Sequence, residues 1–245
     1  MHRFFVNENS INENQIVITG TDVNHIANVL RMQIGETILI SDGNDNEYEC
    51  QISSISQTEV VADIVDFNRE SRELPIDVVL FQGLPKGDKM DTIIEKNIEL
   101  GIKQIVPVKM SRCIVKLDDK KAEKKIQKWN AKAESAAKQS KRGIVPTVSN
   151  VVSYDEALSQ AKQLDVIIVP YELSENMAYT RDVLSQIKPG MSVGIFVGPE
   201  GGFAPEEVKK TLEIGAKEIT LGKRILRTET AGMMLMSVLM YLNEE

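Results

Sequence analysis

The sequence predicts a parallel α/β domain preceded by a small β-rich module, and three observations support this fold class. Near-continuous apolar runs such as Val193–Val197 have the length and composition of strands buried on both faces. Helical patterns stand between these runs, and such alternation builds a parallel sheet. Short strand-like runs with turn signals dominate before Glu70–Pro75, a polar segment closed by proline. We therefore divide the chain into residues 1–72 and residues 73–245.

Composition and charge exclude several classes of protein. The chain has 245 residues, and no apolar run approaches the length of a membrane span, so we expect a soluble, cytoplasmic protein without membrane contact. Cys50 and Cys113 lack metal-type spacing, and with only two histidines we expect no metal site. The net charge of −7 divides into −8 for residues 1–72, +6 for 73–150 and −5 for 151–245. Positive charge gathered in the middle third is typical of a protein with one face toward a polyanion.

The first module contains strand-like runs rich in β-branched residues, bounded by turn signals. These runs are Phe4–Val6, Gln15–Ile18, Thr37–Ser41, Tyr48–Ile55 and Glu59–Asp66. A short helix capped by Thr21 or Asp22 follows the second run, and Val23 and Ile26 lie on its apolar face. Arg31 would stand at the end of that helix, where a positive charge is favoured by the helix dipole. Five strands with one helix predict a compact barrel.

The second domain begins with a strand at Ile76–Phe81, a loop at Pro85–Asp88, a helix at Met90–Leu100 capped by Gly101, and a strand at Ile105–Val108. Further strands and helices alternate later in the chain. The strands are Val166–Val169, Val193–Val197 and Glu218–Leu221, and the helices are Asp155–Gln163, Ala178–Ile187 and Pro205–Ile214. The carboxyl ends of parallel strands share one edge of a sheet, so Pro170–Glu172, Gly198–Gly202 and Leu221–Leu226 are expected to converge.

The segment Asp118–Gln139 has the most regular helical pattern in the chain. Its apolar residues, Trp129 and Ala133 among them, form one stripe, and lysines occupy the other faces. A solvated surface is the ordinary explanation for such lysines. Their position in the basic third of the chain favours contact with nucleic acid, through phosphate and shape because Trp129 lies on the apolar stripe. Lys86 and Lys89, near the start of an earlier helix, leave the same two alternatives open.

The loop Gly198–Gly202 leaves a buried strand and precedes a helix that starts at Pro205. Its glycine spacing matches neither the dinucleotide fingerprint nor the phosphate-binding loop. Glu200 and the acidic residues after Pro205 would repel a phosphate, so the loop suits a neutral or cationic ligand. An incidental tight turn is the alternative. The last helix, Thr230 to Leu242, has almost no polar face, so it is expected in the core or in a subunit interface.

Two motifs in order, Gly198-Pro-Glu-Gly-Gly-Phe203 and Leu221-Gly-Lys-Arg-Ile-Leu-Arg-Thr-Glu-Thr-Ala231, resemble the signature of the RsmE family of 16S ribosomal RNA uridine-N3 methyltransferases. The resemblance extends to Arg3–Val6, His25 with Val29–Arg31, Lys86–Asp91, Glu95 with Glu99–Gly101, and Glu134–Arg142, and so covers nearly the whole chain. It implies a SPOUT-type parallel sheet with a C-terminal trefoil knot, a PUA-like RNA-binding barrel, and a homodimer. It also implies S-adenosylmethionine as methyl donor and ribosomal RNA or the small ribosomal subunit as partner.

The implied reaction and the charge pattern together suggest roles for individual positions. Arg227 would stabilise the uridine anion, and Glu229 or Glu200 would accept its proton. The implied cofactor-binding residues are Pro170, Glu172, Val197, Gly198, Gly201, Gly202, Leu221, Gly222, Arg224, Ile225 and Leu226. The expected RNA contacts are Arg3, Arg31, Lys86, Lys121, Lys124, Lys125, Lys128 and Arg142. Two alternatives remain: a non-catalytic RNA-binding assembly factor with a vestigial pocket, and a nucleotide-dependent enzyme acting on small molecules.

Overall fold

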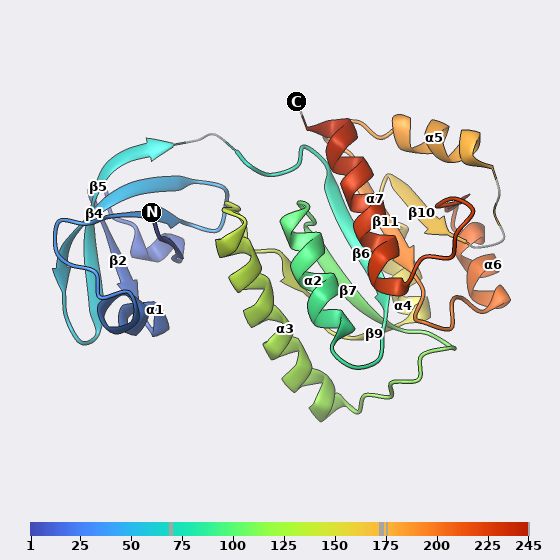
Figure 1. Cartoon of the computed structure of the whole chain (residues 1–245), viewed down its shortest axis with the longest axis horizontal. Coiled ribbons are helices and arrows are strands. Elements are labelled where there is room, and N and C mark those ends of the chain that lie inside the picture. Colours follow the sequence, from blue (N-terminus) through green and yellow to red (C-terminus); the bar gives the residue numbers. More distant parts are fainter. Residues whose placement is uncertain (69–70, 172–173, 175, 245) are drawn as a thin grey trace. The chain divides into compact units, whose positions relative to one another are not determined.

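The computed structural model describes residues 1–68, 71–171, 174 and 176–244 (Figure 1). The chain forms two compact units. The N-terminal unit consists of Met1–Glu73 with Ala137–Val145, and the C-terminal unit consists of Leu74–Ala136 with Pro146–Glu245.

The N-terminal unit is built on one five-stranded sheet in the order β1-β3-β4-β5-β2. Its strands are β1 Arg3–Phe5, β2 Gln15–Thr19, β3 Thr37–Ser41, β4 Glu47–Ile55 and β5 Glu59–Asn68. The strand order makes β1 and β2 the edges of this sheet. The sheet is curled (Figure 1), so the predicted compact barrel is present as an open half-barrel. Fully buried aliphatic side chains form the core of this unit, including Ile16, Ile38 and Ile40. All five strands overlap the predicted runs, and β3 matches its run at both ends.

The helix after β2 differs from its prediction. It starts with α1 (Thr21–Asn24) and continues as the π-helical turn η2 (His25–Val29), in which the Leu30 N–H donates to the His25 carbonyl at 2.8 Å. The N-cap position is Gly20 at φ 76°, so neither Thr21 nor Asp22 caps the helix. Burial of Val23 and Ile26 follows the prediction. A 3₁₀ turn, η1 (Glu8–Ser10), precedes β2.

The C-terminal unit contains a parallel sheet in the order β12-β10-β11-β6-β7-β8, with β9 also paired to β7. Its strands are β6 Asp77–Gly83, β7 Gln104–Lys109, β8 Thr147–Val148, β9 Val152–Ser153, β10 Val166–Pro170, β11 Ser192–Val197 and β12 Lys217–Ile219. Every pairing recorded among these described strands is parallel, which confirms the predicted α/β class. Phe81 on β6 stacks on Phe196 of β11 with ring centres 4.6 Å apart, at the middle of the core.

The helices of this unit cover the sheet. They are α2 Lys89–Glu99, α3 Asp119–Gln139, α4 Tyr154–Ala161, α5 Met177–Ser185, α6 Pro205–Glu213 and α7 Thr228–Asn243, with the last turn of α3 grouped with the N-terminal unit. Helices α2 and α7 pack side by side (Figure 1). No helix among the described residues combines the length and the hydropathy needed to cross a membrane.

Helix α7 is buried on one side only. Leu235, Met236 and Leu239 are fully buried within this chain, whereas Tyr241 is 82% exposed. The side chains of Met234 and Val238 are partly exposed. The apolar sequence of α7 predicted burial on every side, but within the single chain one side of this helix is not covered. The outer side of α7 is left as an apolar surface.

Candidate functional site

A cavity of about 480 Å³ opens at the carboxyl edge of the C-terminal unit's sheet. Three segments form most of its wall: Pro170–Tyr171 at the end of β10, Val197–Phe203 after β11, and Thr220–Thr228 after β12. These are the three strand ends that the sequence predicted to converge. Ten of the proposed cofactor positions line this cavity, namely Pro170, Val197, Gly198, Gly201, Gly202, Leu221, Gly222, Arg224, Ile225 and Leu226. The eleventh, Glu172, lies outside the described residues.

Glycine lets the loop after β11 close on itself. The Gly202 N–H donates to the Pro199 carbonyl at 2.9 Å, and Gly202 adopts φ 66°. A Cβ at Gly198 would lie 3.0 Å from the Gly202 carbonyl carbon, so a side chain there would require the loop to shift. Across the cavity, Gly222 adopts φ 105°. Left-handed backbone at Gly202 and Gly222 favours glycine, and the absence of side chains there leaves room for a ligand.

Two neighbouring side chains fix the loop from outside the cavity. Arg112 Nη1 donates to the Gly201 carbonyl at 2.9 Å. Glu207, only 5% exposed, accepts hydrogen bonds from the backbone N–H groups of Ser111 at 2.7 Å and Ala204 at 2.8 Å. Glu207 therefore serves the N-terminus of α6, which is a structural use of an acidic residue.

Lys89, at the start of α2 and in the cavity wall, pairs with two carboxylates, of which Glu200 also lines the cavity. Its Nζ lies 3.0 Å from Glu200 Oε1 and 3.5 Å from Glu229 Oε2. The Glu200 hydrogen bond raises the pKa of Lys89, with the neighbouring negative charges adding to the effect against burial. Burial pushes the pKa of Glu200 upward, but hydrogen bonds from its own N–H, from Lys89 and from the Lys86 N–H hold it below its usual value. Glu200 is thus held ionised, which makes it a weak proton acceptor.

Arg227 and Glu229 flank Thr228 at the start of α7. Arg227 is the N-cap residue, and its side chain is 82% exposed at the cavity wall. Arg227 Nη1 stands 3.9 Å from Glu229 Oε1, whereas the Glu229 side chain is 17% exposed. The buried Glu229 Oε2 accepts no hydrogen bond from a described residue, and Lys89 at 3.5 Å is its ionic partner. An exposed guanidinium beside a partly buried carboxylate can meet an anionic group at the rim of the cavity.

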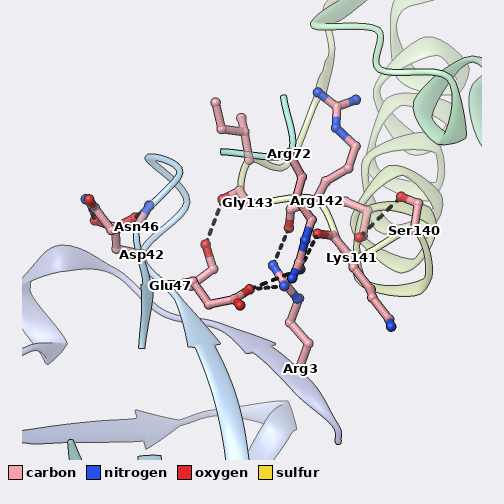
Figure 2. A network of polar contacts seen from close by, with 12 residues as sticks. Arg3, Asp42, Asn46, Glu47, Arg72, Ser140, Lys141, Arg142 and Gly143 are labelled. Carbon is pink, nitrogen blue, oxygen red and sulfur yellow. Dashed lines mark hydrogen bonds and ion pairs between the residues drawn. The ribbon is translucent and has the colours of Figure 1, made fainter. Parts of the chain in front are cut away.

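The structure gives Arg3 and Arg142 a different place from the predicted RNA surface. Figure 2 shows both inside a polar network of the N-terminal unit, where their side chains are 4% and 5% exposed. Arg3 pairs with Glu47 and donates to the Arg142 carbonyl at 2.8 Å, while Arg142 pairs with Glu73. Burial, with Arg72 nearby, lowers the pKa of Arg3 to about 10. Buried and paired guanidinium groups do not reach an RNA phosphate, so the RNA contacts predicted for these two residues are corrected to structural roles.

We call Lys121, Lys124, Lys125 and Lys128 on α3 the lysine face. Lys121 pairs with Asp118 at 3.0 Å, and Lys128 pairs with Asp91 at 2.8 Å. The Lys125 ammonium stands 5.5 Å from the centre of the Trp129 ring. These contacts offset part of the positive charge, but exposed ion pairs are weak enough to exchange for a phosphate. Arg31 is exposed at φ 54°, and Lys86 is exposed beside the cavity loop.

Several wall residues were not predicted, because their residue types carry no chemical signal by themselves. Tyr171, Thr220 and Thr228 line the cavity but were read only as neighbours of motif positions. Lys89 was considered only as a possible phosphate contact. The position of Thr228 directly between Arg227 and Glu229 is the one relevant signal in the sequence.

Comparisons with known proteins match the two units to RNA-modifying families. A family model described as "RNA methyltransferase domain" matches residues 72–240, and one described as "RNA methyltransferase PUA domain" matches residues 18–65. Ribosomal RNA small subunit methyltransferase E of Bacillus subtilis is 41% identical over 231 residues, which cover 93% of this chain and 90% of that protein.

Solved structures give the same result. The structure of ribosomal RNA small subunit methyltransferase E from Neisseria gonorrhoeae bound to S-adenosylmethionine matches with a TM-score of 0.86 and 31% identity, covering 99% of this chain and 98% of that one. A Legionella pneumophila protein in complex with S-adenosylmethionine matches with a TM-score of 0.84 and 30% identity, covering 97% and 96% of the two chains.

Proposed function

This chain belongs to the ribosomal RNA small subunit methyltransferase E family, and from this premise we propose that it transfers the methyl group of S-adenosylmethionine to N3 of a uridine in small-subunit ribosomal RNA. The matches of the family model and of the relatives confirm the predicted family. The observation that carries the proposal is the cavity of about 480 Å³, whose wall combines backbone-rich glycine loops with Arg227 at the rim. The site lies at the carboxyl edge of a parallel sheet, where such folds bind ligands.

The residues of the cavity fit the proposed cofactor. Its volume falls within the range of about 300–1,000 Å³ that is usual for small-molecule sites. Gly198, Gly202 and Gly222 carry no side chains that would obstruct an adenosine, and the glycine loops lack a phosphate-binding fingerprint. Glu200 contributes negative charge, which suits a sulfonium. When bound, the cofactor supplies an electrophilic methyl group.

The protein's own task is to prepare the uridine. Uridine N3–H is an imide, so loss of its proton spreads negative charge over two carbonyl oxygens. Arg227 stabilises that charge from the rim, because its exposed guanidinium is held only at 3.9 Å by Glu229. Glu229 is the freer proton acceptor of the two carboxylates, because Lys89 lies closer to Glu200, at 3.0 Å against 3.5 Å, and only Glu200 also accepts a hydrogen bond from the Lys86 N–H. Loops around the cavity orient nucleophile and methyl group in line.

We further propose roles for the two domains, a knotted topology and a homodimer. Residues 1–72 serve as the PUA-like RNA-binding domain and residues 73–245 as the methyltransferase domain, working in the cytoplasm on ribosomal RNA or the small subunit. The C-terminal segment threads under the cofactor loops as a trefoil knot. A homodimer forms through the outer side of α7, supported by the exposure of Tyr241 and the partial exposure of Met234 and Val238.

RNA binds to the positively charged surface formed by residues 73–150. The lysine face supplies phosphate contacts, with Arg31 and Lys86 as further contacts. Removal of Arg3 and Arg142 from the contact set leaves only side chains that the structure exposes, at least in part.

Calorimetry with S-adenosylmethionine and with NAD tests the proposal against its two alternatives. The proposal predicts binding of S-adenosylmethionine and none of NAD. Binding of NAD alone supports a nucleotide-dependent small-molecule enzyme. Binding of RNA without either cofactor supports an assembly factor with a vestigial pocket. Either of the last two results overturns the proposed function.

A further inference from the structure

A single buried hydroxyl joins three segments around the cavity. Thr228, 6% exposed, is the first residue of α7. Its Oγ1 accepts a hydrogen bond from Gln82 Nε2 at 2.8 Å and donates one to the Gly198 carbonyl at 2.6 Å. Gln82 belongs to β6, and Gly198 begins the loop after β11. The hydroxyl therefore connects the central sheet, the cavity loop and the start of the last helix.

Gln82 is an unusual residue for its position. It is fully buried near the end of β6, where Leu80 and Phe81 are apolar core residues. Its Nε2 also donates to the Gly83 carbonyl at 2.9 Å, but its Oε1 accepts no hydrogen bond from a described residue. A buried amide oxygen without a partner is destabilising relative to an apolar side chain of the same shape. Packing alone therefore does not explain a glutamine at this position. Its side-chain N–H groups, which donate to Thr228 and Gly83, offer an explanation.

The direction of the two hydrogen bonds follows from their chemistry. A threonine hydroxyl has one hydrogen to donate. Because Gln82 donates to the hydroxyl oxygen, the hydroxyl hydrogen is directed at the Gly198 carbonyl. The end of β6 also lies directly against the loop, since a Cβ at Gly83 would stand 2.7 Å from Pro199 Cδ.

We propose that Gln82 and Thr228 are positioning residues for methyl transfer, an inference that rests on the proposed function. Thr228 stands between Arg227 and Glu229 in the chain, so a fixed Thr228 fixes where both side chains begin. The same hydroxyl holds the carbonyl of Gly198 in the cavity wall. One hydrogen-bond chain thus keeps the cofactor loop and the two residues that act on the uridine in register. Positioning to within a fraction of an ångström is what in-line transfer requires.

The test uses variants that change the hydrogen bonds and keep the shape. Thr228→Val removes the hydroxyl from a β-branched side chain, Thr228→Ser keeps it, and Gln82→Met removes the amide from an unbranched one. Calorimetry on the RNA-free protein is expected to show about 10-fold weaker S-adenosylmethionine binding for Thr228→Val and for Gln82→Met, as expected when a buried hydrogen-bonding partner is lost. Thr228→Ser is expected to stay near wild type. The double variant is expected to be no weaker than Thr228→Val, because both changes break one chain.

Thr211→Val is the matched control. Thr211 is another buried helix threonine of the same unit, and its hydroxyl donates to the Glu207 carbonyl at 2.7 Å, away from the cavity wall. It is expected to bind S-adenosylmethionine as the wild type does. The methyl-transfer rate at saturating cofactor is expected to fall in Thr228→Val and to recover in Thr228→Ser.

The outcomes separate this inference from the proposed function. A wild-type protein that binds no S-adenosylmethionine refutes the proposed function itself. A wild-type protein that binds it, with Thr228→Val or Gln82→Met binding equally well, overturns the positioning role. Equal weakening in Thr211→Val, or failure of Thr228→Ser to restore binding, also overturns it. If Thr228→Val does not fold, Gln82→Met and Thr228→Ser still decide the question.

Discussion

Replacement of Arg227 by alanine tests whether this residue acts on the substrate or on the fold. Arg227 is 82% exposed and stands 3.9 Å from Glu229. An ion pair this exposed contributes at most about 1 kcal/mol to stability. Loss of a preorganised group that stabilises transition-state charge costs about 10²–10³-fold in rate, equivalent to about 2.7–4 kcal/mol. The expected effect on the rate therefore exceeds any effect that loss of the ion pair can produce.

The assay is single-turnover methylation of RNA at saturating S-adenosylmethionine, measured across pH, with thermal unfolding and calorimetry on the same samples. Arg227→Ala is expected to keep its unfolding temperature and cofactor affinity while losing rate. Glu229→Gln is expected to lose less and to recover partly at higher pH, where solvent takes the proton more easily. Raised pH is expected to help Arg227→Ala less, because the missing charge stays absent.

Arg181→Ala provides the matched control, since Arg181 is an exposed arginine on α5 outside the cavity wall. It is expected to methylate RNA at the wild-type rate. If Arg227→Ala also transfers methyl at the wild-type rate, or loses cofactor affinity in proportion to its rate, the assignment of Arg227 is refuted.

Gly198→Val is expected to abolish S-adenosylmethionine binding, because its Cβ would lie 3.0 Å from the Gly202 carbonyl carbon; calorimetric binding at wild-type affinity would place the cofactor elsewhere. Reversal of the lysine face to glutamate is expected to weaken RNA binding and reduce its salt dependence, whereas Lys188→Glu on another surface is not; an unaltered salt slope means the face is only solvated. In Lys89→Met, the free energy of unfolding is expected to fall less steeply as the pH is lowered through the acid range than it does in the wild type. Glu200, with its pKa lowered in the folded protein, contributes stability above its unfolded pKa near 4.5 that is lost as pH falls, so an unchanged acid limb of the unfolding profile contradicts this pairing.

The strands could be predicted because their patterns depend only on residues near one another in the sequence. Apolar runs such as Val193–Val197 must be covered on both faces, and the structure places them in a parallel sheet. The place of the cavity was also predictable, because loops that follow parallel strands meet at one edge of the sheet. The π-helical turn at His25–Val29 was not predictable, since its apolar spacing does not differ from that of an α-helix.

Long-range pairing explains the remaining differences. Arg3 and Arg142 were predicted to contact RNA, but in the folded unit they pair with Glu47 and Glu73, which lie 44 and 69 positions away in the sequence. Lys89 became a cavity residue through Glu200 and Glu229, both more than 100 residues later in the chain. No local periodicity carries such information.

The most direct test of the central claim is methyl transfer from labelled S-adenosylmethionine to small ribosomal subunits that lack the modification, followed by mass-spectrometric mapping of the RNA. The account predicts label on N3 of a uridine in the small-subunit RNA, and its absence from the reaction with Arg227→Ala at matched time. Cofactor binding without transfer of label, or label on a different atom or base, would contradict it.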